Sequence, residues 1–153
     1  MAPTIEWHWQ FFTELTRDDL YPILVLRQEV FVVEQNCPYA DADGLDPLAW
    51  HLRGMDDTGS LAAYARVLPP GTRYAEPAIG RLLTAVVHRG SGLGRQVRDE
   101  AVWRCRHAWP HRDIRISAQC HLQPFYREAG FLATGSPYDE DGIPHIEMVL
   151  HPQ

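Results

Sequence analysis

The sequence predicts one domain of the mixed α/β (α+β) class, with a mixed sheet and helices on both of its faces. Alternating apolar and polar segments and segments with helical apolar spacing follow one another in the order βαβββαβαββ. That order is typical of helices packed against a sheet. The chain has 153 residues, 45% of them apolar, which suits a single domain with a single core.

The first predicted elements are a strand, a helix and a long loop. Residues 5–11 alternate apolar and polar side chains, which predicts the first strand. Thr16 is a suitable N-cap, and the apolar residues that follow recur at helical spacing through Val33. Residues 34–48 are acidic and contain two prolines and a glycine, so we expect a loop, and loops of this length are often functional.

Three strands and the longest helix follow this loop. Residues 49–55 and 60–68 predict a hairpin around an Asp-Asp-Thr-Gly turn. Residues 78–87 form a long apolar run, which predicts a further strand. The apolar residues of 93–108 recur every three or four positions until Pro110, so this segment predicts an amphipathic helix.

The last four predicted elements are short. Residues 114–118 predict a strand, and residues 122–129 predict a helix that ends at Gly130, the usual residue type at a helix C-terminus. Residues 132–136 and 145–150 predict two strands that complete the sheet.

Composition argues against several classes of protein. The net charge of −6 is poorly suited to binding nucleic acid. No apolar run approaches the roughly 18 residues that span a membrane, and no signal peptide is evident at the N-terminus, so we expect a cytoplasmic protein. The odd number of cysteines, without paired spacing, argues against a disulfide framework: Cys37, Cys105 and Cys120.

The most specific local motif is Arg89-x-x-Gly92-x-Gly94, between a predicted strand and a predicted helix. Glycines let backbone amides approach a ligand closely, and a helix N-terminus favours phosphate. The chain contains no lysine, which excludes a P-loop. Val97 is too bulky for the last position of a dinucleotide fingerprint. For the motif alone, a glycine-rich turn without a ligand stays an alternative.

A second motif, Tyr126-x-x-x-Gly-Phe, lies on the short helix roughly 30 residues further along. The two motifs in this order resemble the GNAT acetyltransferase superfamily. Residues 27–44 and 140–146 are similar to its ElaA-type branch. The resemblance implies one GNAT domain over residues 1–153, with a mixed, mostly antiparallel sheet whose central strands splay apart.

The resemblance also implies an acetyl-CoA-dependent N-acetyltransferase without a metal, which acts on a small amine or a peptide by direct transfer in a ternary complex. The loop backbone would hold the coenzyme pyrophosphate, and the amide of Leu83 would polarise the thioester carbonyl. Gln119 stands where many relatives carry an asparagine. The implied coenzyme-binding residues are Leu82, Leu83, Thr84, Arg89, Gly90, Ser91, Gly92, Leu93, Gly94, Arg95, Gln119 and Phe125.

Tyr126 matches the usual general acid of the family, although simple packing beside Phe125 would also explain it. For the general base we rank Glu34 first, because burial in the cleft would raise its pKa toward a useful range. His145 and His121 come next, and deprotonation through water, without a single base, is an equal alternative.

The aspartates of the long loop and one central arginine have two interpretations each. Asp41, Asp43 and Asp46 hint at a calcium loop, but the twelfth position is Leu52 instead of glutamate. We therefore expect an acidic rim that attracts an amine. Arg66 either binds an acidic group of the acceptor or pairs with a neighbouring carboxylate.

Other functional alternatives stay open at this stage. The donor could be a longer acyl-CoA, or the protein could be a non-catalytic module that senses acetyl-CoA. Trp7 and Trp9 share one face of the first predicted strand, and an exposed pair would indicate a homodimer contact.

Overall fold

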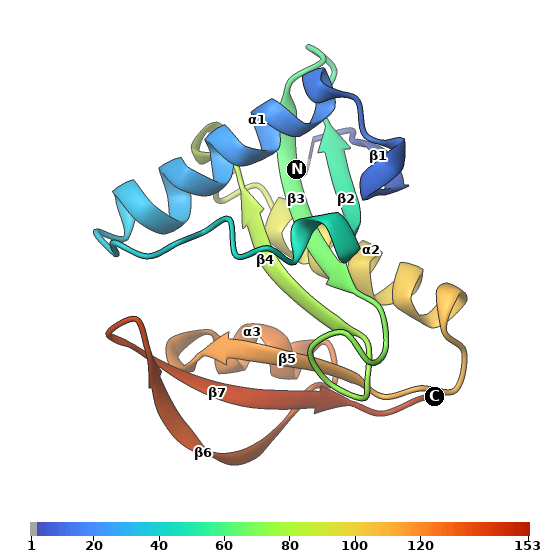
Figure 1. The fold of residues 1–153 in the computed structure, drawn as a ribbon, viewed down its shortest axis with the longest axis vertical. Coiled ribbons are helices and arrows are strands. Elements are labelled where there is room, and N and C mark those ends of the chain that lie inside the picture. Colours follow the sequence, from blue (N-terminus) through green and yellow to red (C-terminus); the bar gives the residue numbers. More distant parts are fainter. Residues whose placement is uncertain (1–2) are drawn as a thin grey trace.

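The computed structural model of the chain describes residues 3–153. Its seven strands are β1 (Glu6–Phe11), β2 (Trp50–Met55), β3 (Leu61–Leu68), β4 (Ala78–Thr84), β5 (Ile114–Gln119), β6 (Leu132–Glu140) and β7 (Ile143–Leu150). They form one sheet in the order β1-β2-β3-β4-β5-β7-β6 (Figure 1). Only β4 and β5 pair in parallel, which confirms the predicted mixed, mostly antiparallel sheet.

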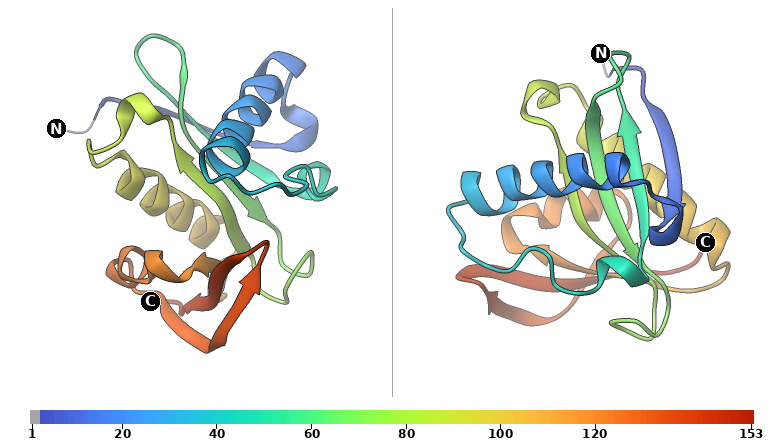
Figure 2. Two further views of the ribbon diagram at one scale, coloured as in Figure 1. Left: turned by 90° about the vertical axis from the view of Figure 1, so that its left-hand side faces the viewer. Right: turned by 45° about the horizontal axis from the view of Figure 1, so that its top comes forward.

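Helices cover both faces of this sheet, as predicted. They are α1 (Arg17–Arg27), α2 (Leu93–Ala108) and α3 (Gln123–Glu128). α1 and α2 lie on opposite faces of the central strands (Figure 2). Thr16 caps α1 by accepting a hydrogen bond from the amide of Asp19, and the helix continues directly into a π-helix over Gln28–Glu34.

Two apolar clusters join the layers. Alternate residues of β3 point to opposite faces, so Ala65 packs with Val97 and its neighbours on α2, whereas Tyr64 packs with Ile23 and Leu26 on α1. Each fully buried leucine or isoleucine side chain stabilises the fold by about 1.5–3 kcal/mol. Trp7 and Trp9 are half-buried against the larger cluster, so they are not the exposed pair that would indicate a dimer contact.

The two central strands, β4 and β5, part soon after they meet. Ala78 and Arg115 are their only paired residues within the described chain. The register of β4 with β3 shifts between Gly80 and Leu83, and Arg81 between them has a left-handed φ of +51°. A bulge of this kind bends and twists a strand. The splay implied by the family resemblance is therefore confirmed, and the bulge in β4 accompanies it.

The structure corrects the ends of several predicted elements. The strand predicted over 78–87 stops at Thr84, because the apolar residues after it form a 3-10 turn at Val86–His88. β6 and β7 are longer than predicted and are joined by a tight turn at Asp141 and Gly142, which both have positive φ. In the described part of the chain, no helix combines the length and apolar character that crossing a membrane requires.

The long loop between α1 and β2 is fixed by buried ion pairs. Arg27 of α1 is fully buried, and its guanidinium donates to the carboxylates of Asp41 (2.8 Å) and Asp46 (2.7 Å). Burial alone would raise the pKa of Asp46, but the hydrogen bonds and charges of Arg27 and Arg66 outweigh burial and lower it. These pairs tie the loop to the helix.

Two more arginines complete this network from the sheet. Arg66 of β3 donates to both carboxylate oxygens of Asp43, at 2.7 and 2.9 Å. Arg81 in the β4 bulge lies 2.9 Å from a carboxylate oxygen of Asp41. The structure therefore corrects the expected acidic rim, because the loop carboxylates are neutralised internally. It also settles Arg66 as a residue that pairs with neighbouring carboxylates.

Candidate active site in the cleft between β4 and β5

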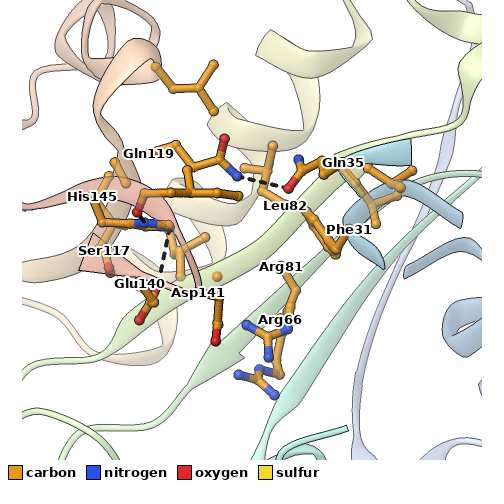
Figure 3. A pocket seen from close by; sticks show the side chains of 18 of the residues that line it. Phe31, Gln35, Arg66, Arg81, Leu82, Ser117, Gln119, Glu140, Asp141 and His145 are labelled. Carbon is orange, nitrogen blue, oxygen red and sulfur yellow. Dashed lines mark hydrogen bonds and ion pairs between the residues drawn. The ribbon is translucent and has the colours of Figure 1, made fainter. Parts of the chain in front are cut away.

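The splayed strands open a cavity of about 740 Å³. One wall comes from the end of the π-helix and the loop after it, and the other comes from β5, α3 and the β6–β7 turn (Figure 3). The structure brings most of the predicted site residues together in the lining, namely Glu34, Leu82, Leu83, Thr84, Arg89, Gly94, Gln119, His121, Phe125, Tyr126 and His145. The other predicted residues, Gly90–Leu93 and Arg95, are not part of the lining.

The glycine loop presents unpaired amides at the start of α2. Gly90 and Gly92 have φ values of +79° and +87°, which other residue types rarely adopt, and no side chain caps the helix at Gly92. Within residues 3–153, no hydrogen-bond acceptor is found for the amides of residues 90–95. Unpaired amides at a helix N-terminus suit a phosphate group, as the motif predicted.

Glu34 and Arg89 face each other across the mouth of the cavity. The guanidinium of Arg89 donates two hydrogen bonds to the carboxylate of Glu34, at 2.6 and 2.8 Å. The Glu34 side chain is 43% exposed, and its hydrogen bond to Arg89 lowers its pKa. The expectation that burial would raise the pKa of Glu34 is therefore wrong, and in this position the carboxylate is a poor general base.

Some backbone amides of the bulged strand β4 do not point to β3 and are therefore available in the cleft. The amide of Ala85 donates to the carbonyl of Ala62 on β3, at 2.8 Å. Because hydrogen-bonding directions alternate along an antiparallel ladder, the Leu83 amide, two positions earlier, also points to β3. The amides of Leu82 and Thr84 point the other way. The candidate donor for a thioester carbonyl is thus Leu82, not Leu83 as the sequence suggested.

Tyr126 lies on α3 and lines the cavity with its half-buried ring. It packs edge-to-face against Phe125, with ring centroids 5.0 Å apart, and against Phe131 at 5.9 Å. Burial raises the pKa of Tyr126 to about 12, although the charge of Arg98 acts in the opposite direction. The phenol is therefore protonated at neutral pH and can donate a proton.

Phe125 closes the junction between α3 and the start of α2. A Cβ at Gly94 would lie 3.8 Å from the Phe125 ring, so the two elements are in direct contact. The guanidinium of Arg98 lies over the same ring, 4.8 Å from its centroid, and donates to the Phe125 carbonyl. These contacts hold the tyrosine helix against the glycine loop. Arg95 points away to pair with Glu128, at 2.8 Å.

His145 is buried and engaged at both ring nitrogens. Its Nδ1 lies 2.7 Å from the carbonyl oxygen of Ile143, and its Nε2 lies 3.2 Å from a carboxylate oxygen of Glu140. Both ring nitrogens therefore face hydrogen-bond acceptors within the protein, so neither is free to approach an amine. His145 is thus not arranged as a direct base. Glu140, which the prediction missed, lines the cavity beside it, and the tight turn between the two residues was the available signal.

Two contacts cross the cleft from the wall that follows the π-helix. The side-chain amide of Gln119 on β5 donates to the side-chain oxygen of Gln35, at 3.3 Å (Figure 3). The thiol of Cys37 donates to the carbonyl of Asp141 in the β6–β7 turn, at 3.3 Å. The sequence prediction did not include Gln35. No group of three or more potential metal ligands occurs in the part of the chain that the structure describes.

Comparisons with known proteins agree with this geometry. A family model described as an acetyltransferase (GNAT) domain matches residues 50–152. A UPF0039 protein of Synechocystis is 48% identical over 146 residues, which covers 95% of each chain. Protein ElaA of Escherichia coli is 42% identical and covers 94% of this chain and 95% of its own.

Solved structures show the same relationship. An acyl-CoA N-acyltransferase from Pseudomonas aeruginosa superposes with a TM-score of 0.91 at 41% identity, covering 96% of this chain and 99% of that one. The crystal structure of Escherichia coli ElaA superposes with a TM-score of 0.90, covering 97% and 100%. The chain therefore belongs to the GNAT superfamily, in its ElaA-type branch, and is an acyltransferase that uses an acyl-CoA as co-substrate.

Proposed function

We propose that this enzyme is an N-acetyltransferase that moves the acetyl group of acetyl-CoA to a primary amine of a small molecule or peptide. The observation that carries the proposal is the set of unpaired amides at residues 90–95, beside the cleft that contains Tyr126. The three cysteines are unpaired thiols, as is usual in a reducing compartment, and this supports a cytoplasmic location.

In this proposal the donor lies along the outer edge of β4. The amides of residues 90–95 bind the diphosphate of the coenzyme, and the positive end of α2 adds to this attraction. The pantetheine arm then runs between β4 and Gln119 of β5. The amide of Leu82 donates to the thioester carbonyl and stabilises the negative charge that develops on its oxygen.

The acetyl group moves directly from sulfur to nitrogen. The neutral amine attacks the thioester carbon, so that a C–N bond forms and a tetrahedral intermediate carries the oxyanion near Leu82. When the C–S bond breaks, Tyr126 gives its proton to the leaving thiolate. The excess proton of the new amide nitrogen passes through cavity water to Glu140, which His145 holds in place. Solvent then takes this proton from Glu140 and returns one to Tyr126, so that both groups regain their starting states.

A panel of amines tests this proposal. Each amine is mixed with acetyl-CoA, free thiol is followed spectroscopically, and the acetylated product is identified by mass. Thiol release that depends on both protein and amine is the expected result. Longer acyl-CoA donors, run in parallel, distinguish acetyl transfer from transfer of larger groups. Coenzyme binding without thiol release for any amine would favour a sensing module, and no heat with millimolar acetyl-CoA in calorimetry would refute the proposal.

A further inference from the structure

Glu34, the last residue of the π-helix, and Gln35, which follows it, form hydrogen bonds with side chains that the proposed coenzyme site needs. Glu34 binds the guanidinium of Arg89, at the edge of the glycine loop. Gln35 accepts a hydrogen bond from the side chain of Gln119 on β5. The first contact lies at the proposed diphosphate end of the groove, and the second lies along the proposed path of the pantetheine arm.

We propose that Glu34 and Gln35 act as an internal substitute for the coenzyme and set its affinity by competing for Arg89 and Gln119. The inference rests on the proposed function of the same cleft. The chemistry of the two contacts matches the coenzyme: a carboxylate offers two anionic oxygens as a diphosphate does, and a side-chain carbonyl offers the acceptor that a pantetheine amide offers. Acetyl-CoA must therefore displace both residues.

Electrostatics requires the displacement of Glu34. Its carboxylate lies 2.6 Å from the group that would meet a diphosphate, and Arg89 holds the pKa of Glu34 below its usual value, so the carboxylate stays ionised. Both terminal nitrogens of Arg89 are bonded to Glu34, so a diphosphate can bind them only after at least one of these hydrogen bonds breaks, and its negative charge then repels the nearby carboxylate. The ion pair is also easy to break, because its side chains are 39% and 43% exposed and exposed pairs contribute little stability.

The segment that carries the two residues has structural features that favour movement. Residues 28–34 form a π-helix, a winding that is rare and frequently found at functional sites. Asn36, two positions after its last residue, has a left-handed φ of +49°. Val33 is 74% exposed, whereas Val30 is buried in the cluster that packs against α1. Residues 33–36 can therefore leave the groove while the core contacts of Val30 and Phe31 stay in place.

The substitution Glu34→Gln tests the inference. It removes the competing charge and keeps the shape, so acetyl-CoA should bind about threefold to tenfold more tightly by calorimetry at low salt, and the difference should shrink at high salt. The kinetic effect should fall on KM for acetyl-CoA. Glu29→Gln is the matched control, because Glu29 is exposed on the same π-helix and makes no ion pair among the described residues.

A double substitution shows whether the effect runs through Arg89. In an Arg89→Gln background, Glu34→Gln should no longer change the affinity for acetyl-CoA. Gln35→Ala should tighten binding by a smaller factor, because a neutral hydrogen bond to Gln119 is weaker than an ion pair.

Each other outcome has a defined meaning. Weaker binding by Glu34→Gln would show that Glu34 positions Arg89 for the coenzyme, and a lower kcat at constant affinity would show a role as general base. Either result overturns the inference, as does an unchanged affinity. Failure of the unsubstituted protein to bind acetyl-CoA would instead remove the proposed function on which the inference rests.

Discussion

At the scale of single residues, burial decides what the phenol of Tyr126 can do. With its pKa raised to about 12, this side chain holds its proton throughout the pH range in which enzymes are assayed. It can therefore give a proton to a thiolate, but it cannot serve as a base. Phe125 and Phe131 keep the ring in place, so its removal should affect chemistry more than structure.

The substitution Tyr126→Phe should lower kcat by about 100-fold or more and leave the affinity for acetyl-CoA unchanged. Steady-state kinetics and calorimetry measure the two quantities separately, and Tyr21→Phe, at a tyrosine that is 70% exposed, is the control. The unsubstituted enzyme should also show no loss of rate below pH 10 that is due to this phenol. A loss of less than twofold in kcat would remove Tyr126 from the mechanism.

Glu140 is the second residue whose role is testable alone. Glu140→Gln keeps a hydrogen-bond acceptor near His145 but removes the carboxylate that we propose as the final proton acceptor. We expect kcat to fall about tenfold to 100-fold, with unchanged binding of acetyl-CoA in calorimetry. An unaltered kcat would mean that cavity water carries the proton to solvent without this side chain.

At the scale of elements, coenzyme binding should affect the π-helix and the start of α2 in opposite ways. The amides of residues 90–95 gain acceptors from the diphosphate, so their hydrogen exchange should slow when acetyl-CoA is added. Residues 28–36 lose the contacts of Glu34 and Gln35, so their exchange should stay the same or become faster. Exchange followed by mass spectrometry resolves both segments, and slower exchange in both would contradict the displacement.

Local patterns in the sequence were sufficient for the order and type of the elements, since period-2 and period-3.6 spacing is a property of neighbouring residues. They were insufficient where the outcome depended on distant partners. Arg27 lies 14 positions from Asp41, and Arg81 lies 40 positions from it, so no window of the sequence shows that these side chains pair. The apolar run after Thr84 had the composition of a strand, but it turns close to the first residue of β3, Leu61, after Ala85 has bonded to Ala62.

The candidate site likewise has features that the sequence could predict and features that depend on distant residues. The glycine loop and Tyr126 were recognisable because each motif is contiguous. The unsuitability of Glu34 and His145 as bases was not, because it follows from their pairing with Arg89 and Glu140 in the folded chain. The choice of Leu82 instead of Leu83 as the proposed amide donor rests on which amides of β4 point toward β3, and sequence alone does not supply this direction.

At the scale of the whole molecule, the buried network makes stability depend on acid pH. Asp43 and Asp46 have lowered pKa values in the folded chain, because their bonds to arginines outweigh burial. The unfolded chain, with aspartate pKa values of about 3.9, therefore binds more protons in mild acid. The contribution of these aspartates to the free energy of unfolding should be fully present above about pH 5 and should fall as the pH drops below about 4. Urea unfolding between pH 3 and 7 measures this, and a flat profile would contradict it.

The same network predicts the effect of a core substitution. Arg27→Met fits the space of the side chain but removes the fully buried cation that Asp41 and Asp46 share. We expect a loss of about 3–5 kcal/mol in the free energy of unfolding, measured by urea denaturation. Arg112→Met, at an exposed arginine that bonds only a backbone carbonyl, is the control. A loss below about 1 kcal/mol would show that the network contributes specificity to the fold instead of stability.

The single ladder pair between Ala78 and Arg115 has a consequence for descent. The glycine loop and the bulge of β4 lie on one side of this junction, and the β6–β7 turn lies on the other. Because few backbone hydrogen bonds join the two sides, substitutions in the β6–β7 turn should disturb the bulge and the glycine loop little. Related enzymes can therefore differ in this turn, and in the acceptor that it faces, while they keep the same site for the acyl donor.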